Sequence, residues 1–358
     1  MKHPIDLGAR TPANQVNIKI AYRLSPLSPH CFPEHHLGTN PDPNMSGLTE
    51  SQVASFRENG YLVLPDYLTP TETNTLITET NNLLRDFPLD THPLTQFTTG
   101  DGIDESTNHV GDDYFLNSGD KIRFFFEPDA FSTKPDPVTG RAALLKPKNL
   151  AVNKIGHSLH TLSPPFKAVS LNERNAAVAK SLGFTDPRVL QSMVILKQPS
   201  IGGAVPSHRD SEFLYTDPPS AVGWWYALQD ASPKNGTLGM WKGSHTGRKG
   251  GHIKRRFVRK GDGGTEFIEN AGPALPRGME EEKVSEPSDE DLEILDIKAG
   301  SLVLIHGNVL HKSEKNTSDR SRFAYTFHVI EGGQGWEYDE RNWLQPPAGG
   351  FSKLESCV

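Results

Sequence analysis

The chain has 358 residues, a formal net charge of −7 and two cysteines, Cys31 and Cys357. This length fits one large catalytic domain, because sheet-based domains of about 200 to 250 residues commonly remain single. The sequence contains no run of about 18 consecutive apolar residues, so no membrane span is predicted. The negative charge argues against nucleic acid or an anionic membrane as the main partner, and the two distant cysteines argue against a disulfide framework and for a reducing compartment.

Residues 1–45 differ in composition from the rest of the chain. They are rich in Pro, His and Asn and have no sustained helical or strand period, so we predict a disordered extension ahead of one domain over residues 46–358. The scattered basic residues of this extension are compatible with a mitochondrial leader, and RLSPLSPHC at 23–31 partly matches a peroxisomal address. Because neither signal is complete, the cytosol is the default expectation.

Three helices are predicted in the first half of the chain. Thr49 and Gln52 form a capping box for a short helix that ends near Gly60. A second helix over residues 70–85 begins with proline, and a third over residues 172–182 stops at a glycine. The apolar face of the second helix consists of Leu76, Ile77, Leu83 and Leu84.

Strand-like runs dominate the chain after the third helix. One predicted strand, residues 61–65, directly follows the first helix, and the others cover residues 189–197, 223–228, 238–241, 302–305 and 323–330. Helices followed by many strands favour an α+β protein, in which a helical layer backs a barrel-like β-sandwich.

Residues 248–293 form an insertion rich in Gly, Lys, Arg and acidic residues. Charge clusters of this kind are usually solvated loops, and we predict a charged loop here. The alternative is a mobile lid over a substrate-binding mouth, with the basic half at 250–260 facing an anionic substrate.

A His-x-Asp pair, His208 and Asp210, lies in the segment PSHRDSEFLYTDP. In a strand, residues i and i+2 project to the same face, so both side chains can reach one metal ion while Arg209 points away. A third ligand is expected from a distant strand, and His311 fits because it follows the apolar run 301–305. Two imidazoles and one carboxylate bind one face of Fe(II) and leave positions open for O₂, which predicts a non-haem iron site.

Arg322 follows His311 after ten intervening residues and opens the strand-like stretch RFAYTFHV. Its guanidinium could hold one end of a dicarboxylate through a bidentate pair while the metal chelates the other end. Lys154 is a second cation suited to a carboxylate, and Ser313 shares the face of His311 if that segment is extended. This combination is typical of 2-oxoglutarate-dependent dioxygenases.

Four further histidines are not assigned to the site. His306 lies five residues before His311, so the two would face opposite ways in a continuous strand, and His245 is typical of a turn; we interpret both as structural. His157 and His160 have the spacing of a helical metal pair, but a neighbouring lysine is better explained by cosubstrate binding, and we leave them unassigned.

Several segments carry a resemblance to a known family. They are SGDKIRFFFE (118–127), NKIGHSLH (153–160), QSMVILKQP (191–199), HRDSEFLYTDP (208–218), NGTLGMWKGSH (235–245), the run at 302–328 and NWLQP (342–346). In these segments the chain resembles the phytanoyl-CoA hydroxylase family of Fe(II)/2-oxoglutarate dioxygenases. The resemblance covers most of the chain from about residue 46 onward.

The resemblance implies a fold, a ligand set and a reaction. The implied fold is a double-stranded β-helix, or jelly roll, in which His208, Asp210 and His311 bind Fe(II). The residues implied to hold 2-oxoglutarate are Lys154, Met193, Trp225, Ser313 and Arg322. The implied reaction uses O₂ to hydroxylate an unactivated C–H bond of a small organic substrate while 2-oxoglutarate becomes succinate and CO₂, with ascorbate as a supporting reductant. The substrate and the oligomeric state stay open.

Two positions refine this expectation. Arg209 stands where relatives often carry Gln, and because it is expected to face outward it should affect the mouth of the site rather than the iron. Asp210 keeps the carboxylate that halogenating relatives lose to make room for chloride, which favours hydroxylation. The alternative is a non-catalytic metal-binding or sensor protein on the same fold, and the intact set of Arg322, Ser313 and Lys154 favours the enzyme.

Overall fold

The computed structural model describes residues 47–98, 111–135, 137, 140, 142–279, 282 and 285–355. The extension predicted at residues 1–45 lies outside this part of the chain. The described α-helices are α1 (Glu50–Asn59), α2 (Pro70–Asp86), α3 (Asp113–Leu116), α4 (Leu159–Leu162), α5 (Pro164–Ser170) and α6 (Glu173–Leu182). None of the helices in the described residues combines the length and apolarity needed to cross a membrane.

Two antiparallel sheets hold most of the described strands. The larger sheet runs in the order β1 (Tyr61–Leu64), β14 (Leu302–His306), β9 (Val222–Ala227), β16 (Arg322–Glu331), β6 (Pro187–Lys197), β5 (Val152–His157) and β2 (Ile122–Phe126), with β18 (Ser352–Lys353) paired to β6. The smaller sheet runs in the order β13 (Leu292–Ile294), β10 (Leu238–Trp241), β15 (His311–Ser313) and β7 (Val205–His208). The remaining strand pairs are β11 (Arg255–Arg259) with β12 (Thr265–Glu269), β17 (Glu337–Tyr338) with β8 (Thr216–Asp217), and β3 (Phe131–Pro135) with β4 (Ala142–Leu144).

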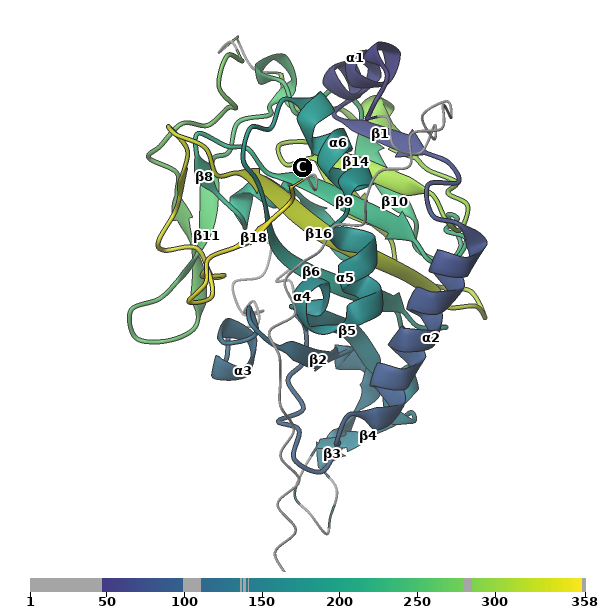
Figure 1. Ribbon diagram of the computed structural model, residues 1–358. Coiled ribbons are helices and arrows are strands. Elements are labelled where there is room, and N and C mark those ends of the chain that lie inside the picture. The colour runs from purple at the N-terminus through teal and green to yellow at the C-terminus, as the bar shows by residue number, and fades with distance from the viewer. Residues whose placement is uncertain are drawn as a thin grey trace, which may run out of the picture. The chain divides into compact units, whose positions relative to one another are not determined.

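The larger sheet packs against helices on one face and against the smaller sheet on the other. Leu76 of α2, Phe166 of α5 and Phe327 of β16 are fully buried in one apolar cluster, and Figure 1 shows α5 and α6 lying across strands of this sheet. On the opposite face, Trp225 of β9 shares a second cluster with Met240 of β10. Because successive residues of a strand point to opposite faces, β9 contributes Trp224 to the first cluster and Trp225 to the second. These layers confirm the predicted α+β class.

The predicted helix ends are confirmed where capping residues mark them. Thr49 and Gln52 form the capping box of α1, and Gly60 ends the helix at a φ of 80°, a left-handed conformation that suits glycine. Asn172 caps the start of α6 by accepting a hydrogen bond from the Asn175 backbone N–H. The predicted apolar face of α2 packs on the core, with Leu76 and Leu84 buried and Ile77 and Leu83 partly buried, and Thr73 and Thr80 are buried as well.

All six predicted strands are present, with ends shifted by at most two residues. The structure adds β2 and β5 at one edge of the larger sheet and the short strands β7 and β15 in the smaller one. β7 has the sequence VPSH and β15 the sequence HKS. Both are too short and too polar to show the period-two pattern that identifies strands.

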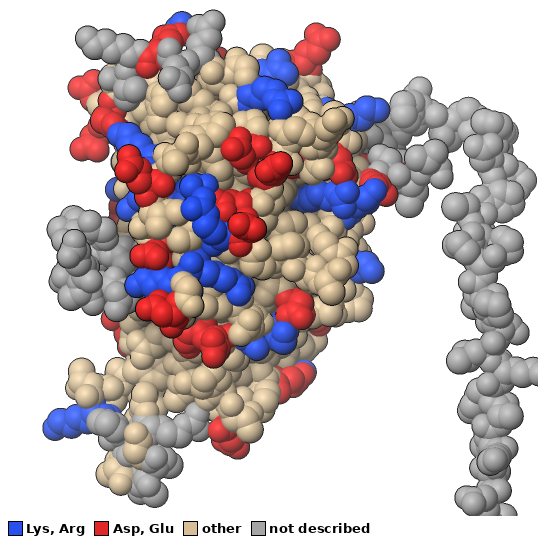
Figure 2. All heavy atoms as spheres, turned by 90° about the vertical axis from the view of Figure 1, so that its left-hand side faces the viewer, with Lys and Arg blue, Asp and Glu red and all other residues tan. Residues whose placement is uncertain are grey.

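The charged insertion is a solvated loop only in part. β11 and β12 form a hairpin, paired from Arg255 opposite Glu269 to Arg259 opposite Thr265. Phe257 of β11 is 2% exposed and packs in an apolar cluster with Trp343. On the face of the molecule that carries this hairpin, acidic and basic side chains lie next to one another (Figure 2). The insertion is therefore anchored by a buried aromatic residue, which its charged composition concealed.

Candidate active site

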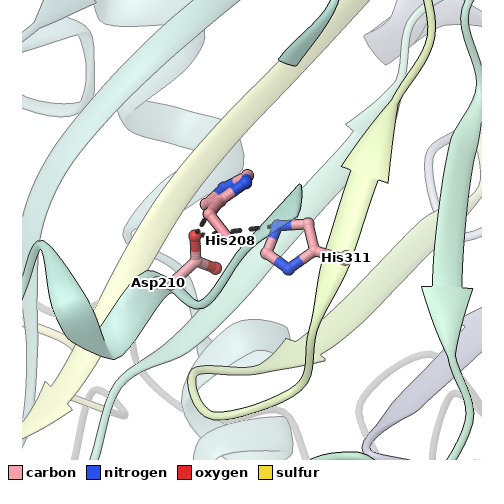
Figure 3. A group of neighbouring side chains, drawn as sticks. All are labelled: His208, Asp210 and His311. Atoms are coloured by element: carbon pink, nitrogen blue, oxygen red, sulfur yellow. Dashed lines mark ion pairs between the residues drawn. The ribbon is translucent and has the colours of Figure 1, made fainter. Parts of the chain in front are cut away.

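His208, Asp210 and His311 meet at the edge of the smaller sheet. β15 pairs with β7 so that His311 lies opposite His208, and Figure 3 shows both rings turned toward the Asp210 carboxylate. Asp210 Oδ1 lies 3.5 Å from His208 Nε2 and 3.7 Å from His311 Nε2. Within the described part of the chain, one ligand atom from each of the three lies within 4.8 Å of the others. Three donors at this spacing can share one metal ion.

The backbone between His208 and Asp210 differs from the prediction only in part. His208 ends β7, and Asp210 begins a 3-10 turn, Asp210–Glu212, rather than continuing the strand. Arg209 between them is nevertheless extended, with φ −118° and ψ 129°, so the expected alternation still puts the side chains of His208 and Asp210 on one side and that of Arg209 on the other. His208 is half-buried and Asp210 is buried.

Backbone carbonyls fix which nitrogen of each histidine faces the metal position. His208 Nδ1 lies 2.8 Å from the Pro206 carbonyl oxygen, and His311 Nδ1 lies 3.2 Å from that of Val309. A carbonyl oxygen only accepts hydrogen bonds, so both Nδ1 atoms carry the proton and donate. The Nε2 lone pairs are consequently free to bind a metal. In metal sites, the ring nitrogen that does not bind the metal commonly makes a hydrogen bond of this kind, which fixes the orientation of the imidazole.

A third histidine, His328 of β16, contacts the same carboxylate and was missed by the sequence reasoning. Its Nε2 lies 3.2 Å from Asp210 Oδ2, and its Nδ1 lies 3.4 Å from the Gln191 amide nitrogen. The amide N–H donates to Nδ1, so His328 Nε2–H donates to Oδ2 and leaves Oδ1 toward the other two imidazoles. The even spacing from Arg322 to His328, which puts both on one strand face, could have identified it.

Burial and the neighbouring groups set the charges of this cluster. Burial raises the pKa of the Asp210 carboxyl, but His328, His311 and His208 together hold that pKa well below its ordinary value. Burial lowers the pKa of His311 to about 4, so this imidazole is neutral at neutral pH. Burial also lowers the pKa of His208, but the hydrogen bond and the charge of Asp210 together raise that pKa above its ordinary value.

One cavity contains all eight residues that the sequence predicted for the site. Its volume is about 1030 Å³. The predicted residues on its wall are Lys154, Met193, His208, Asp210, Trp225, His311, Ser313 and Arg322. Thr326 of β16 lies in register with Met193 of β6 and with Trp225 of β9, which places these three side by side on the face of the larger sheet that lines the cavity.

Arg322 is a buried cation with unused hydrogen-bonding capacity. It is 1% exposed, and only its Nη2 is bonded, to the Gly236 carbonyl oxygen at 2.8 Å. Its Nε and Nη1 are buried without a hydrogen-bond partner among the described residues. Burial lowers its pKa to about 9, which still leaves it charged at neutral pH. Buried unpaired donors are costly, so a carboxylate ligand that accepts from both nitrogens fits this position.

Two lysines increase the positive charge at this end of the cavity. Lys154 Nζ lies 3.4 Å from the centre of the Phe97 ring, and burial lowers its pKa to about 7. Lys197, which was not predicted, donates to the carbonyl oxygens of Gly203 and Glu314. Glu127 is the one buried carboxylate on this part of the described wall. An anionic ligand would balance the excess of cations.

The remaining histidines lie outside the metal group. His245 Nε2–H donates to the Arg57 carbonyl oxygen at 3.0 Å, and the His306 ring lies beside it, 4.8 Å away between ring centres and tilted by 50°. His160 Nδ1 pairs with Ser192 Oγ at 2.8 Å. None of these three lines the cavity, whereas His157 does.

Arg209 turns away from the cavity, as predicted, but is not simply exposed. Its Nε donates to the Asn308 carbonyl oxygen at 3.1 Å and its Nη2 to that of Gly250 at 2.6 Å. It therefore ties the backbone between His208 and Asp210 to two other segments of the chain.

The fold is that of the iron- and 2-oxoglutarate-dependent dioxygenases. The chain is similar to the non-haem α-ketoglutarate-dependent carbocyclase SnoK from nogalamycin biosynthesis, with a TM-score of 0.51 and 17% identity over 82% of this chain and 87% of that one. The epimerase SnoN in complex with Fe³⁺, α-ketoglutarate and nogalamycin RO gives a TM-score of 0.50 and 16% identity over 86% of this chain and 93% of that one. The implied jelly roll is confirmed.

The chain belongs to the phytanoyl-CoA dioxygenase (PhyH) family, whose model matches residues 56–324. It is 42% identical over 310 residues to phytanoyl-CoA dioxygenase domain-containing protein 1 of Bos taurus, which covers 84% of this chain and 96% of that protein. It is 38% identical over 298 residues to the phytanoyl-CoA dioxygenase of Arabidopsis thaliana, covering 83% and 94% of the two chains. The family resemblance read from the sequence is confirmed.

Replacing Arg209 with alanine should destabilise the fold. Arg209→Ala leaves the carbonyls of Asn308 and Gly250 without their donors, and we expect a loss of about 1–3 kcal/mol in unfolding free energy, measured by denaturant titration. Lys254→Ala is the control, because Lys254 and its partner Glu286 are 65% and 62% exposed, and it should change stability by less than about 0.5 kcal/mol. Equal effects of the two substitutions would contradict the tethering role.

Proposed function

We propose that the chain is an Fe(II)- and 2-oxoglutarate-dependent dioxygenase, carried by one domain over residues 46–358, that hydroxylates an unactivated C–H bond of a small organic substrate. In this reaction O₂ supplies the hydroxyl oxygen of the product, and 2-oxoglutarate loses CO₂ and takes up the second oxygen as succinate. The observation that carries the proposal is one cavity that joins a His–Asp–His group to a buried arginine with two unpaired donors.

The donor set fits ferrous iron. His208, Asp210 and His311 would hold the ion through Nε2, Oδ1 and Nε2, because the other polar atoms of these side chains are already engaged. Two nitrogens and one carboxylate oxygen are donors that suit iron and would leave room for other ligands. Bound there, iron would supply the activation of O₂ that no side chain of the protein can provide.

The cation-rich end of the cavity fits 2-oxoglutarate. Arg322 would hold the distal carboxylate through Nε and Nη1, with Ser313 as a second donor and Lys154 adding positive charge. Met193 and Trp225 would form apolar walls along the carbon chain of the cosubstrate. The metal group and Arg322 line the same cavity, which suits a dianion chelated at one end and clamped at the other.

The alternative of a non-catalytic metal-binding or sensor protein explains fewer of the contacts. A structural metal needs no buried guanidinium with two unpaired nitrogens in the same cavity, and such a group is expensive to keep. The retained Asp210 carboxylate supports hydroxylation over halogenation. The phytanoyl-CoA substrate in the family's description is not carried over to this chain.

Release of succinate from labelled 2-oxoglutarate tests the proposal. With Fe(II), ascorbate and air, the wild-type protein should form succinate, and His311→Ala should lose both iron binding and turnover because one of three ligands is gone. His245→Ala is the matched control, since His245 is a buried histidine that does not line the cavity, and its turnover should persist. Full iron-dependent turnover by His311→Ala would show the ligand assignment to be wrong.

His328→Leu should weaken iron binding without removing a ligand. The substitution leaves Asp210 Oδ2 without its donor, so the carboxylate can rotate away from the two imidazoles. Loss of contacts to a ligand of this kind typically costs about 10–100-fold in metal affinity. Anaerobic calorimetry with Fe(II) measures this directly, and wild-type affinity in His328→Leu would argue against a role in orienting the carboxylate.

The affinity for 2-oxoglutarate should fall as the pH rises above neutrality. Burial lowers the pKa of Lys154 to about 7, and a bound dianion would raise that pKa again. The protonated form binds better, so affinity is greatest below pH 7 and falls by up to about tenfold per pH unit above it. Binding measured from about pH 6 to about pH 9 should show a smaller slope in Lys154→Met; it should not vanish, because burial also lowers the pKa of Lys197 to about 7. An unchanged slope would exclude Lys154.

A further inference from the structure

His157 is a buried polar residue of the cavity that neither the iron group nor the cosubstrate clamp uses. It ends β5, is 1% exposed and lines the cavity. His160, three residues later, turns to Ser192 and does not reach the cavity. The structure thus separates two histidines that the sequence left together and puts one of them on the active-site wall.

The contacts of His157 determine what it offers to a ligand. Ser118 Oγ donates its one hydrogen to the Phe115 carbonyl oxygen at 2.5 Å. The Ser118 oxygen has no second hydrogen to donate, so it accepts a hydrogen bond from His157 Nδ1, 2.7 Å away. His157 Nδ1 therefore carries the proton. Burial, with the nearby charges of Lys154 and Arg123, holds the pKa of His157 well below its ordinary value. The ring is neutral, and Nε2 is an acceptor to which no described residue donates.

Aromatic rings surround this acceptor. The His157 ring lies 5.2 Å from that of Trp343 and 5.7 Å from that of Phe115, nearly perpendicular to the latter. Phe115 and Trp343 stack on each other at 4.4 Å with an interplanar angle of 16°, and both line the cavity. Flat apolar surfaces beside one acceptor suit a planar ring with a hydrogen-bond donor at its edge.

The Phe115–Trp343 wall is held in place by the hairpin of the charged insertion. Arg259 of β11 donates to the Trp343 carbonyl oxygen at 2.6 Å and to that of Leu116 at 2.5 Å. Phe257 and Phe267 of the same hairpin line the cavity and pack 5.2 Å apart. A prearranged wall reduces the entropy lost when a ligand binds.

The remaining cations of the cavity wall are already balanced by carboxylates. Arg255 pairs with Glu212 at 3.1 Å, Lys312 with Glu314 at 2.7 Å, and Lys315 with Asp129 at 2.6 Å. The mixture of acidic and basic side chains on the hairpin face follows the same pattern (Figure 2). In the described part of the wall, the cations without such a pair are Arg322 and Lys154, which are assigned to the cosubstrate, and Lys197, which donates to the carbonyl oxygens of Gly203 and Glu314 at the same end of the cavity. A second anion would find no unpaired cation away from the cosubstrate, which favours an uncharged substrate.

We propose that the substrate is an uncharged, planar and largely apolar molecule whose hydroxyl or N–H group donates to Nε2 of His157 beside the Phe115–Trp343 wall. This inference rests on the proposed dioxygenase function, because it treats the cavity as an active site. It makes His157 a specificity-determining residue, which discriminates between substrates by the presence of a donor. Sites that offer one buried acceptor reject analogues that lack the matching donor.

A matched pair of probes tests the inference. 2-Naphthol carries a hydroxyl donor, and 2-methoxynaphthalene has the same ring without one. Binding of both is measured by calorimetry under argon, with and without Fe(II) and 2-oxoglutarate. The wild-type protein should bind 2-naphthol about tenfold more tightly than its methyl ether, as one hydrogen bond to a buried neutral acceptor predicts. In His157→Phe the ratio of the two affinities should fall to about one.

Two further variants keep the test decisive. Ser118→Ala retains the imidazole but frees Nδ1, so the other tautomer becomes available and the affinity ratio should also fall. His160→Gln alters a buried histidine outside the cavity and should keep the wild-type ratio. The inference is overturned if wild type does not distinguish the probes or if His157→Phe and Ser118→Ala leave the ratio unchanged. Succinate formation without added substrate reports separately on the dioxygenase function, so one idea can fail while the other stands.

Discussion

The buried carboxylate of Asp210 joins the two sheets of the molecule. Its Oδ1 faces His208 and His311 on the smaller sheet, and its Oδ2 accepts from His328 on the larger one. A buried charge is tolerated only when partners compensate for the lost hydration, and removing one partner commonly costs about 3–5 kcal/mol. The spacing of the sheets at this point is therefore tied to the geometry of three histidines, and a metal ion would take over part of the same compensation.

The opposite end of the cavity has the reverse polarity. Arg322, Lys154 and Lys197 bring three buried cations together, while Glu127 supplies one carboxylate. Without a ligand this arrangement is unfavourable, because burial acts against charged forms and two nitrogens of Arg322 lack acceptors. Local violations of good packing and pairing are expected at functional sites rather than elsewhere. A dicarboxylate that bridges the metal group and the guanidinium would relieve both ends at once.

The chemistry of the candidate site could largely be predicted from the sequence, because the type of each residue limits what it can bind. The arrangement of these residues in space was harder to predict. The His–Asp–His group and Arg322 followed from spacing, and the alternation expected between His208 and Asp210 holds through the extended Arg209, although the strand itself ends at His208. His328 was missed because every residue of β16 is buried. A strand that is buried on both faces shows no alternation of apolar and polar residues from which the two faces could be told apart. His157 could not be placed, since its role depends on Ser118, a contact between residues 39 positions apart.

The hairpin of the insertion shows why composition alone misjudged this region. Two arginines of the hairpin are not solvated charges: the buried Arg256 pairs with the Asp339 carboxylate, and Arg259 donates to two carbonyl oxygens of other segments. β11 also continues its backbone bonding into the segment around Asn342, through a bridge from Val258. An element bonded along one edge and anchored by Phe257 cannot swing freely without breaking these contacts together. The charges of the insertion therefore fix an aromatic wall of the cavity, and the substrate that we propose would meet a preformed surface there rather than a lid that closes over it.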